Sequence, residues 1–461
     1  MHRFVLVIAV LVMLGWSVAA LAQQTPPVQP KIQETPLPPA VTLPPPPTVP
    51  ADVPNRPLTA DEAALIALHH QPNVAIAQAG VYAAQGRHEQ AKAGLLPTLG
   101  GAASYTNVAL SPVGVVPGSG TTTGFQFTAN LRQLVFDFNH TRDVVNQAHA
   151  LELSFGANLT RVQSDTVLQV KQAFYAYAQN ARLVVVNEAN VRNAQNHLAL
   201  AQARLNAGLG LPADVVRAQT AVADAIFNLT LARNASSVAR VNLAELMGID
   251  PRTPVEPADA NEAVIAADDP NALNAEGLKR RPEILQACLN LTAAKYAVGA
   301  AKTTDAPSLS ANAGMLQRGR NLSLGNNTLT YGVVIEWTPF DAGFTAGRVE
   351  EARANLMAAQ AQLDSARLGV TSDVSQAYLN LKTAEQRTIT AEAEVANATE
   401  AVRLTEGRYK SGLGTFLDVL DAQTALVTAN SNRVNAQSAV NQARAALAHA
   451  IGEPCAPKIA K

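Results

Sequence analysis

The sequence predicts an elongated α+β architecture in which two similar halves each combine a β-hairpin with a very long helical hairpin. Residues 204–221 and 408–425 are identical at 10 of 18 aligned positions, which indicates a duplicated unit. Apolar and polar residues alternate strictly over residues 125–132, as in a strand with one apolar face. Residues 142–207 and 342–411 contain no proline, which predicts two uninterrupted helices.

Residues 1–22 have the organisation of a cleaved secretory signal peptide. A short basic start precedes roughly 15 apolar residues, and Ala20-Leu21-Ala22 has the small-residue pattern of a cleavage site. The apolar stretch is shorter than the ~20 residues that a membrane-spanning helix needs. Residue 23 is Gln rather than cysteine, so we expect a mature chain that leaves the cytoplasm without a lipid anchor.

Residues 23–57 are expected to form a proline-rich linker, because 13 of the 32 residues from 26 to 57 are proline. Such a composition favours an extended, semi-rigid spacer, and a proline-rich recognition motif is the alternative. The two similar units follow the linker. Their expected limits are 58–250 for the first unit, 251–272 for a linker between the units, 273–453 for the second unit and 454–461 for a tail.

Each unit is expected to begin with helix and to continue into two strands. In the first unit the helical pattern starts after Thr59, a capping residue followed by acids, and continues to about Gly94, with Pro97 beyond its end. Strands of about ten residues are long enough to cross a bilayer when they are tilted. The expected strands span residues 98–110 and 125–132 in the first unit, and 308–318 and 329–338 in the second.

Two helical hairpins with tight tips follow the strands. At 1.5 Å per residue, a helix of ~66 residues extends roughly 100 Å. Gly208 and Gly412 are placed to end the long helices in the left-handed conformation, after which each chain segment returns as a helix of ~35 residues. Pro212 suits the first turn of one returning helix, and Thr415 with Asp418 forms the capping-box pattern of the other.

The four expected strands raise a problem of closure. A sheet of four strands leaves two unpaired edges, which hydrocarbon does not tolerate. A closed barrel needs at least about eight strands, so the chain must self-associate if its sheet enters a membrane. The formal net charge of −1 gives no electrostatic reason to expect binding to nucleic acid.

Three motifs occur in both halves: RxxxGLGxxxDVxxAQTA at the tips, Phe-Asp after each β-hairpin, and Pro-x-Leu before each first strand. Over residues 58–453 they resemble the TolC outer-membrane efflux protein family. The resemblance implies an α+β membrane protein. It would be a homotrimer whose twelve strands, four per chain, form one β-barrel in the lipid of the outer membrane, continued by a long periplasmic α-helical barrel.

The resemblance also implies a function, the exit duct of a tripartite efflux or export system that includes a periplasmic adaptor and an inner-membrane transporter. A duct for type I polypeptide secretion is an alternative, because substrate choice resides largely in the partners. A periplasmic coiled-coil scaffold without a pore is an alternative of another class, which the alternating strands argue against.

The first unit departs from the family pattern where its second strand ends. The second unit has the family's Thr-Pro-Phe-Asp-x-Gly at residues 338–343, whereas the first unit has Asn139 in place of the glycine. We therefore expect the exit from that strand to bend differently.

The resemblance assigns Asp418 and Asp421 to the periplasmic mouth of the tunnel. They lie three residues apart and hence on one face of a helix. Three copies would place six carboxylates around one axis, which favours cations and raises the pKa values of these groups by like-charge repulsion. Capping of the returning helix is the alternative role of Asp418.

Tyr409 and Asp214 match positions that link neighbouring hairpins and hold the mouth shut in relatives. The basic partner that some relatives have is replaced by Gly414 in this chain, and Arg217 is a candidate substitute. The turns are expected to have two roles. They close the hairpins, and they dock the adaptor through small apolar side chains on accessible backbone. The docking residues are Gly208, Leu209 and Gly210 at one tip, and Gly412, Leu413 and Gly414 at the other.

The sequence contains no pattern that indicates an enzyme. It has no Ser/His/Asp set, no pair of carboxylates in a cleft pattern and no zinc motif. His69, His70 and His88 are interpreted as lone histidines on helix surfaces without ligand spacing. We therefore expect no catalytic residues, no cofactor and no bound metal.

Overall fold

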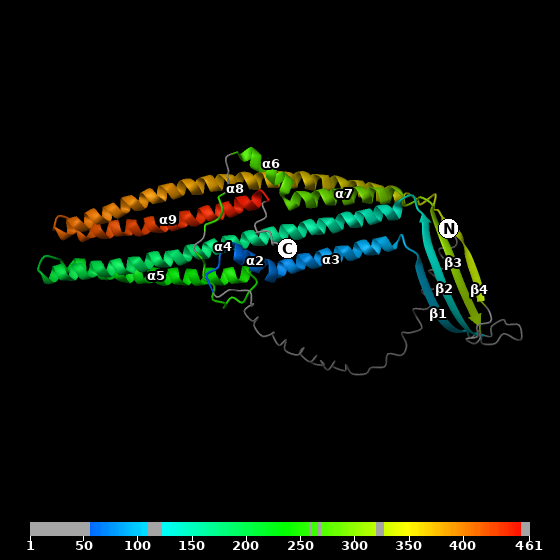
Figure 1. Cartoon of the computed structure of the whole chain (residues 1–461), viewed down its shortest axis with the longest axis horizontal. Coiled ribbons are helices and arrows are strands. Elements are labelled where there is room, and N and C mark those ends of the chain that lie inside the picture. Colours follow the sequence, from blue (N-terminus) through cyan, green and yellow to red (C-terminus); the bar gives the residue numbers. More distant parts are fainter. Residues whose placement is uncertain (1–55, 109–121, 259–260, 265–268, 320–326, 453–461) are drawn as a thin grey trace, which may run out of the picture. The chain divides into compact units, whose positions relative to one another are not determined.

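The computed structural model describes residues 56–108, 122–258, 261–264, 269–319 and 327–452, all of which belong to one compact unit. The expected signal peptide, nearly all of the expected proline-rich linker and the expected tail lie outside these residues. The same order of elements occurs twice (Figure 1). The first set is α2 Ala60–His70, α3 Pro72–Ala93, β1 Thr98–Val108, β2 Thr122–Phe136, α4 His140–Asn206 and α5 Pro212–Leu246; the second is α6 Pro270–Arg280, α7 Pro282–Lys302, β3 Ser308–Gly319, β4 Asn327–Glu336, α8 Phe344–Lys410 and α9 Phe416–Ala450.

The prediction of two long helices, each followed by a returning helix, is confirmed. Both α4 and α8 contain 67 residues, and both α5 and α9 contain 35. The helix α4 lies beside α5 and α8 lies beside α9, so each pair forms a helical hairpin (Figure 1). Among the described residues, no helix combines the length and the apolar character that a membrane span requires.

The helical pattern predicted from Thr59 to about Gly94 is confirmed, but it forms two helices rather than one. Thr59 does cap α2, in a capping box with Glu62, but the helix ends at His70 and a new one starts at Pro72. Proline has no N–H and disfavours helical backbone in the residue before it. Gln71 accordingly has extended angles, with φ −70° and ψ 120°, so Pro72 ends one helix and begins the next.

The four strands form one antiparallel sheet in the order β1-β2-β3-β4. All four predicted strands are therefore confirmed, with β2 extending to Phe136 and β4 ending at Glu336. Rows of paired residues alternate between apolar and polar character, as the pleat requires. One row contains Leu99, Leu131, Ala313 and Tyr331, and the next row, on the opposite face, contains Gly100, Asn130, Gly314 and Thr330.

The apolar face of the sheet is uncovered in a single chain. The side chain of Tyr331 is 84% exposed, and Leu329, Val333 and Ile335 on the same face of β4 are also exposed. The strands β1 and β4 are the edges, because each pairs with only one other strand among those described. The chain thus presents a large apolar surface and two edges with unpaired backbone groups.

The expectation of different bends at the two strand exits is wrong. Asn139 has φ 70° and Gly343 has φ 91°, so both adopt the left-handed conformation directly before a long helix. Asparagine is one of the few residues besides glycine that visit this conformation readily. In both halves the Phe-Asp aspartate then accepts a hydrogen bond from a backbone N–H in the first turn, Asp137 from Thr141 at 2.8 Å and Asp341 from Thr345 at 2.6 Å.

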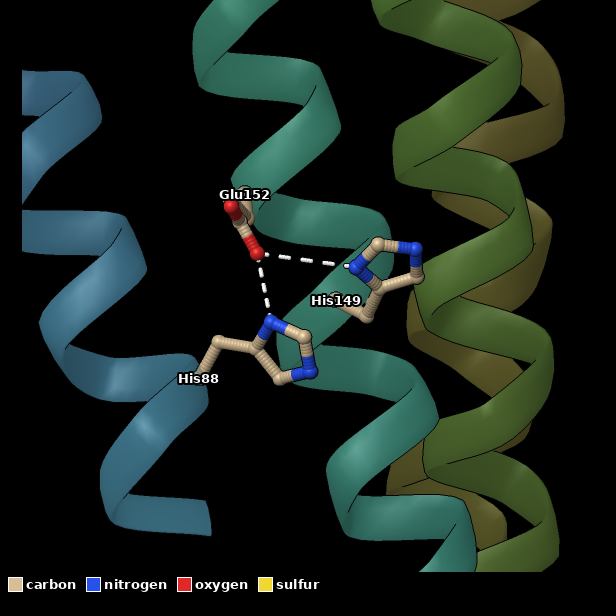
Figure 2. A group of neighbouring side chains, drawn as sticks. All are labelled: His88, His149 and Glu152. Atoms are coloured by element: carbon tan, nitrogen blue, oxygen red, sulfur yellow. Dashed lines mark hydrogen bonds and ion pairs between the residues drawn. The ribbon is translucent and has the colours of Figure 1, made fainter. Parts of the chain in front are cut away.

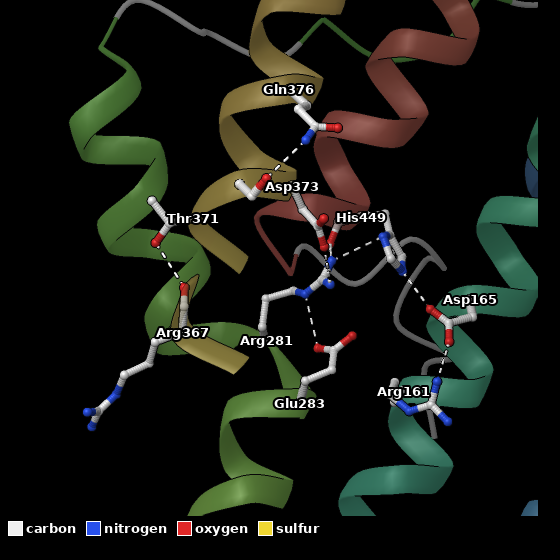
Figure 3. A network of polar contacts seen from close by, with 10 residues as sticks. Arg161, Asp165, Arg281, Glu283, Arg367, Thr371, Asp373, Gln376 and His449 are labelled. Carbon is white, nitrogen blue, oxygen red and sulfur yellow. Dashed lines mark hydrogen bonds and ion pairs between the residues drawn. The ribbon is translucent and has the colours of Figure 1, made fainter. Parts of the chain in front are cut away.

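A partly buried polar network joins the two halves (Figure 3). Arg281, only 6% exposed at the start of α7, donates to Asp373 of α8 at 3.1 Å and to the carbonyl oxygen of His449 of α9 at 3.1 Å. The ring of His449 lies 2.9 Å from Asp165 of α4. Burial acts to raise the pKa of Asp165, but the contacts with His449, Arg161 and Arg281 lower it below its usual range.

Close backbone approach makes one glycine particularly sensitive to substitution. Gly248 and Gly208 both have φ +72°, but a Cβ on Gly248 would lie 2.7 Å from the backbone of His70, whereas a Cβ on Gly208 would meet nothing within 4 Å. We expect Gly208→Ala to cost about 1 kcal/mol through backbone strain alone. Gly248→Ala should cost a further ~1–3 kcal/mol, because α2 must move away.

Chemical or thermal unfolding of the two purified variants measures this difference. Equal destabilisation in Gly248→Ala and Gly208→Ala would contradict the close packing of α2 against the end of α5.

Candidate functional site

The candidate site lies where the tips of the two helical hairpins meet. Both long helices end in the same hydrogen-bonded turn. The N–H of Leu209 donates to the carbonyl oxygen of Arg204 at 2.9 Å, and the N–H of Leu413 donates to that of Arg408 at 2.8 Å. Gly208 and Gly412 have φ +72° and +79°, as predicted for the residue that ends a helix in the left-handed conformation.

The turns present their leucines to solvent. Leu209 is 72% exposed and Leu413 is 75% exposed. Gly210 has an ordinary φ but leaves no space for a side chain, because its Cβ would lie 2.9 Å from the backbone nitrogen of Leu205. Each tip is therefore a compact turn with one apolar side chain projecting from it.

The returning helices begin as predicted. Pro212 occupies the first turn of α5. At the start of α9, the hydroxyl of Thr415 accepts from the N–H of Asp418 at 3.2 Å, and the carboxylate of Asp418 accepts from the N–H of Thr415 at 3.0 Å. These hydrogen bonds, first that from the Thr415 backbone, lower the pKa of Asp418. Capping is therefore a role of Asp418 within one chain.

The second predicted mouth residue, Asp421, is exposed one helical turn after Asp418. Among the described residues it has no hydrogen bond or ion pair, so it serves no evident structural purpose in a single chain. The rise in pKa expected from a ring of carboxylates concerns several copies and stays a prediction.

A small apolar cluster fills the space between the two hairpins. Tyr409 from the end of α8 and Phe416 from the start of α9 pack with ring centroids 5.4 Å apart, and they are 4% and 1% exposed. Ala201 of α4 and Ala218 of α5 pack against them from the first hairpin. The small alanine side chains let the aromatic rings of one hairpin lie directly on the helices of the other.

Arg204 fastens the two tips together. Its guanidinium carbon lies 4.5 Å from the centroid of the Tyr409 ring, a cation–π contact. It donates to the carbonyl oxygen of Tyr409, to that of Lys410 at 3.2 Å and to that of Leu209 at 3.3 Å. The arginine therefore bridges the C-terminal ends of α4 and α8, where unpaired carbonyl groups carry partial negative charge.

The structure brings the predicted pair Tyr409 and Asp214 together. Burial and the nearby carboxylate of Asp214 both raise the pKa of the Tyr409 hydroxyl. The hydroxyl oxygen is buried without a hydrogen-bond partner among the described residues. Arg217, the suggested basic partner, is exposed on α5 and forms no ion pair within the described part of the chain. The cation at this position is that of Arg204.

Sequence reasoning did not recognise the role of Arg204. The available signal was its recurrence, because Arg204 and Arg408 start the repeated motif at both tips. Among the described residues, Arg408 donates to its own turn alone, to the carbonyl oxygen of Leu413 at 3.4 Å. The residue that follows Arg204 is Leu205, whereas Tyr409 follows Arg408, so the aromatic partner exists in only one half.

The interpretation of His88 as a lone surface histidine is wrong. His88 is 8% exposed on α3, and its Nδ1 lies 2.5 Å from a carboxylate oxygen of Glu152 on α4 (Figure 2). His149 approaches the same oxygen. His88 lies 64 residues before Glu152, so the local spacing of His149 and Glu152 on α4 did not indicate this cluster.

Comparison with known proteins identifies the family. The sequence profile of the outer membrane efflux proteins matches residues 65–249 and 274–453. Outer membrane efflux protein BepC of Brucella suis biovar 1 is 27% identical over 332 residues, which cover 71% of this chain and 72% of BepC. Outer membrane protein TolC of Escherichia coli strain K12 is 25% identical over 368 residues, covering 76% and 73%.

A solved structure has the same fold. The crystal structure of the outer membrane protein VceC from Vibrio cholerae has a TM-score of 0.77 at 23% identity, and the alignment covers 85% of this chain and 96% of VceC. The family profile matches both halves of the chain, well over half of its length. The chain therefore belongs to the outer membrane efflux protein family.

Proposed function

We propose that this chain is the outer-membrane exit duct of a tripartite export system. After removal of residues 1–22 it would remain unlipidated, insert its strands into the outer membrane and extend its helices into the periplasm. Substrates would reach it from an inner-membrane transporter through a periplasmic adaptor. Membership of the outer membrane efflux protein family and the likeness to outer-membrane proteins of known structure support this proposal.

The observation that carries the proposal is the open, apolar sheet. Tyr331 and its neighbours on β4 are exposed in a single chain, and β1 and β4 have unpaired edges. In hydrocarbon the apolar face is favoured, but every backbone N–H and C=O must be paired. Pairing β4 of one copy with β1 of the next satisfies both requirements, and three copies give a closed barrel of twelve strands.

The same observation argues against a soluble scaffold, because such a protein would expose these side chains and edges to water. Small-molecule efflux and polypeptide secretion need the same duct, so the described sheet and helices suit both functions.

Asp421 of three copies would contribute carboxylates around the axis of the tunnel mouth and favour cations there.

A direct test uses the full chain purified in detergent and reconstituted in planar bilayers. We expect a trimer by native mass spectrometry and ion passage with a preference for cations. Asp421→Asn should weaken that preference without loss of stability, because Asp421, unlike Asp418, caps no helix. A strictly monomeric protein, or one that passes no ions even when its tips are destabilised, would overturn the proposal.

The contacts of Arg204 support a role in closing the mouth. Tyr409, Asp214 and Arg204 join the two hairpins of one chain through cation–π, hydrogen-bonding and charge interactions. Charge-assisted hydrogen bonds contribute about 1.5–3 kcal/mol each. We therefore propose that opening requires these contacts to break, so that the two tips can separate.

Removal of the gate residues should raise single-channel conductance. Asp214→Asn, Tyr409→Ala and Arg204→Ala each weaken the closed state, and Arg204→Ala should shift the closed-to-open ratio by ~10-fold or more. Arg217→Ala is the matched control, because it removes an exposed arginine from the same hairpin without breaking a described contact. Conductance equal to that of the unmodified protein in all three variants would exclude these residues from the gate.

The exposed turns support docking of the adaptor. Leu209 and Leu413 are exposed, and the neighbouring glycines leave the backbone around them accessible. Such apolar side chains can insert into a pocket on the surface of a partner. The remaining turn residues, Gly208, Gly210, Gly412 and Gly414, would allow the close approach of that partner.

Paired substitution of the two leucines tests the docking proposal. Leu209→Arg with Leu413→Arg should leave trimers and ion passage intact but abolish export in a strain that lacks its own copy of the chain. Leu209→Met with Leu413→Met keeps the apolar character and should retain export. Full export by the arginine variant would exclude the tips as the docking surface.

A further inference from the structure

Two imidazoles and one carboxylate converge between α3 and α4. Glu152 and His149 lie three residues apart on α4, and His88 faces them from α3 (Figure 2). The Nδ1 atoms of His88 and His149 lie 2.5 Å and 3.5 Å from the same carboxylate oxygen of Glu152. All three potential ligand atoms fall within 4.8 Å of one another.

Burial differs among the three groups in a way that suits a site open on one side. The side chains of His88 and Glu152 are 11% and 21% exposed, whereas that of His149 is 52% exposed. The buried His88 and the partly buried Glu152 are held by the helix interface, and the exposed His149 closes the site from the solvent side. An ion could therefore enter next to His149 without separating α3 from α4.

The second half of the chain contains the same helix joint without the polar groups. By the alignment of the two halves, Val298 corresponds to His88 and Leu356 to Glu152, while Arg353 corresponds to His149. Val298 and Leu356 belong to one apolar cluster between α7 and α8. An ordinary apolar contact is thus sufficient to pack this joint. The histidines and the glutamate of the first half need another explanation than packing.

The chemistry of the three groups selects a class of ligand. Two imidazole nitrogens and one carboxylate oxygen suit borderline transition-metal cations and do not suit Mg²⁺ or Ca²⁺, which prefer oxygen ligands. A tetrahedral Zn²⁺ with bonds of ~2.0–2.1 Å places its ligand atoms ~3.3 Å apart. The observed separations of 2.5 and 3.5 Å lie on either side of that value, so small side-chain rotations would accommodate the ion.

We propose that His88, His149 and Glu152 form a binding site for a divalent transition-metal cation of the Zn²⁺ class. The ion would join α3 to α4 through one ligand from the first helix and two from the second, and water would complete its coordination on the exposed side. The site is independent of the helical tips, so it stands whether or not the proposed gate is correct.

Metal titration of the full chain tests the proposal. The protein is purified without a histidine tag, stripped with a chelator and titrated with ZnCl₂ at neutral pH by calorimetry, with elemental analysis for stoichiometry. We expect one saturable site per chain. Co²⁺ at the same site should give the visible absorption of a four- or five-coordinate ion, which a nonspecifically bound hydrated ion lacks.

The second half of the chain supplies the matched variant. His88→Val with Glu152→Leu copies the apolar pair Val298 and Leu356, so the helix joint should persist while metal binding is lost. Glu152→Gln changes the charge with almost no change in shape and should weaken binding at least ~10–100-fold. Circular dichroism and the oligomeric state confirm that each variant is folded.

His69→Gln with His70→Gln is the control for other histidines, since both precede Pro72 on α2, outside the cluster. We expect its affinity for Zn²⁺ to be unchanged. The proposal is overturned if the unmodified chain shows no saturable binding, if Glu152→Gln and the valine–leucine variant bind as tightly as the unmodified chain, or if the loss of His69 and His70 abolishes binding.

Discussion

The unpaired backbone groups along β1 and β4 impose the main constraint on this molecule. A sheet of four strands cannot satisfy its own edges, and here one face is also apolar and exposed. Water can hydrate the unpaired backbone groups but disfavours the exposed apolar face, and leaves the edges free to pair with other chains. Hydrocarbon favours the apolar face but leaves the edges unsatisfied. In the proposed duct, the number of strands per chain therefore requires several copies, whose long helices would surround a common axis.

The chain consists of two halves with the same order of elements. A left-handed residue, Asn139 or Gly343, follows the Phe-Asp motif directly before each long helix, and the Gly-Leu-Gly turn ends both helices. The halves differ at particular contacts. Arg204 meets the aromatic ring of Tyr409 across the hairpins, whereas Arg408 reaches only its own turn within one chain. The joint of α3 and α4 is polar where that of α7 and α8 is apolar. Such differences between equivalent positions indicate contacts that serve a purpose other than the packing shared by the two halves.

Much of the fold could be predicted from the sequence because its signals are local. Each of these signals determines structure within a few residues of itself. They are the alternation of apolar and polar residues over 125–132, the absence of proline over 142–207 and the capping box at Thr415. The helix break at Pro72 was also a local signal, and the prediction of a continuous helix gave the proline too little weight. Asn139 was misjudged for a related reason, since asparagine can adopt the backbone conformation that the pattern reserves for glycine.

The candidate sites were less accessible from sequence. Tyr409 and Asp214 were found through the family motif, but Arg204 bonds to a carbonyl group 205 residues away, and His88 meets Glu152 across 64 residues. Contacts between helices depend on the rotation and offset of each helix, which no spacing within one helix encodes. Only the comparison of equivalent positions in the two halves, such as His88 with Val298, carries some of this information.

If the tips separate as proposed, the position of Arg204 also determines how they can do so. Its cation belongs to one hairpin, while the oxygen atoms of Tyr409 and Lys410 belong to the other. A slight separation breaks the hydrogen bonds before a water molecule can fit between the partners, so the first fraction of an ångström is the most costly. Beyond that point solvent replaces the lost bonds. The hairpins should therefore change between two discrete arrangements, with few chains found at intermediate widths.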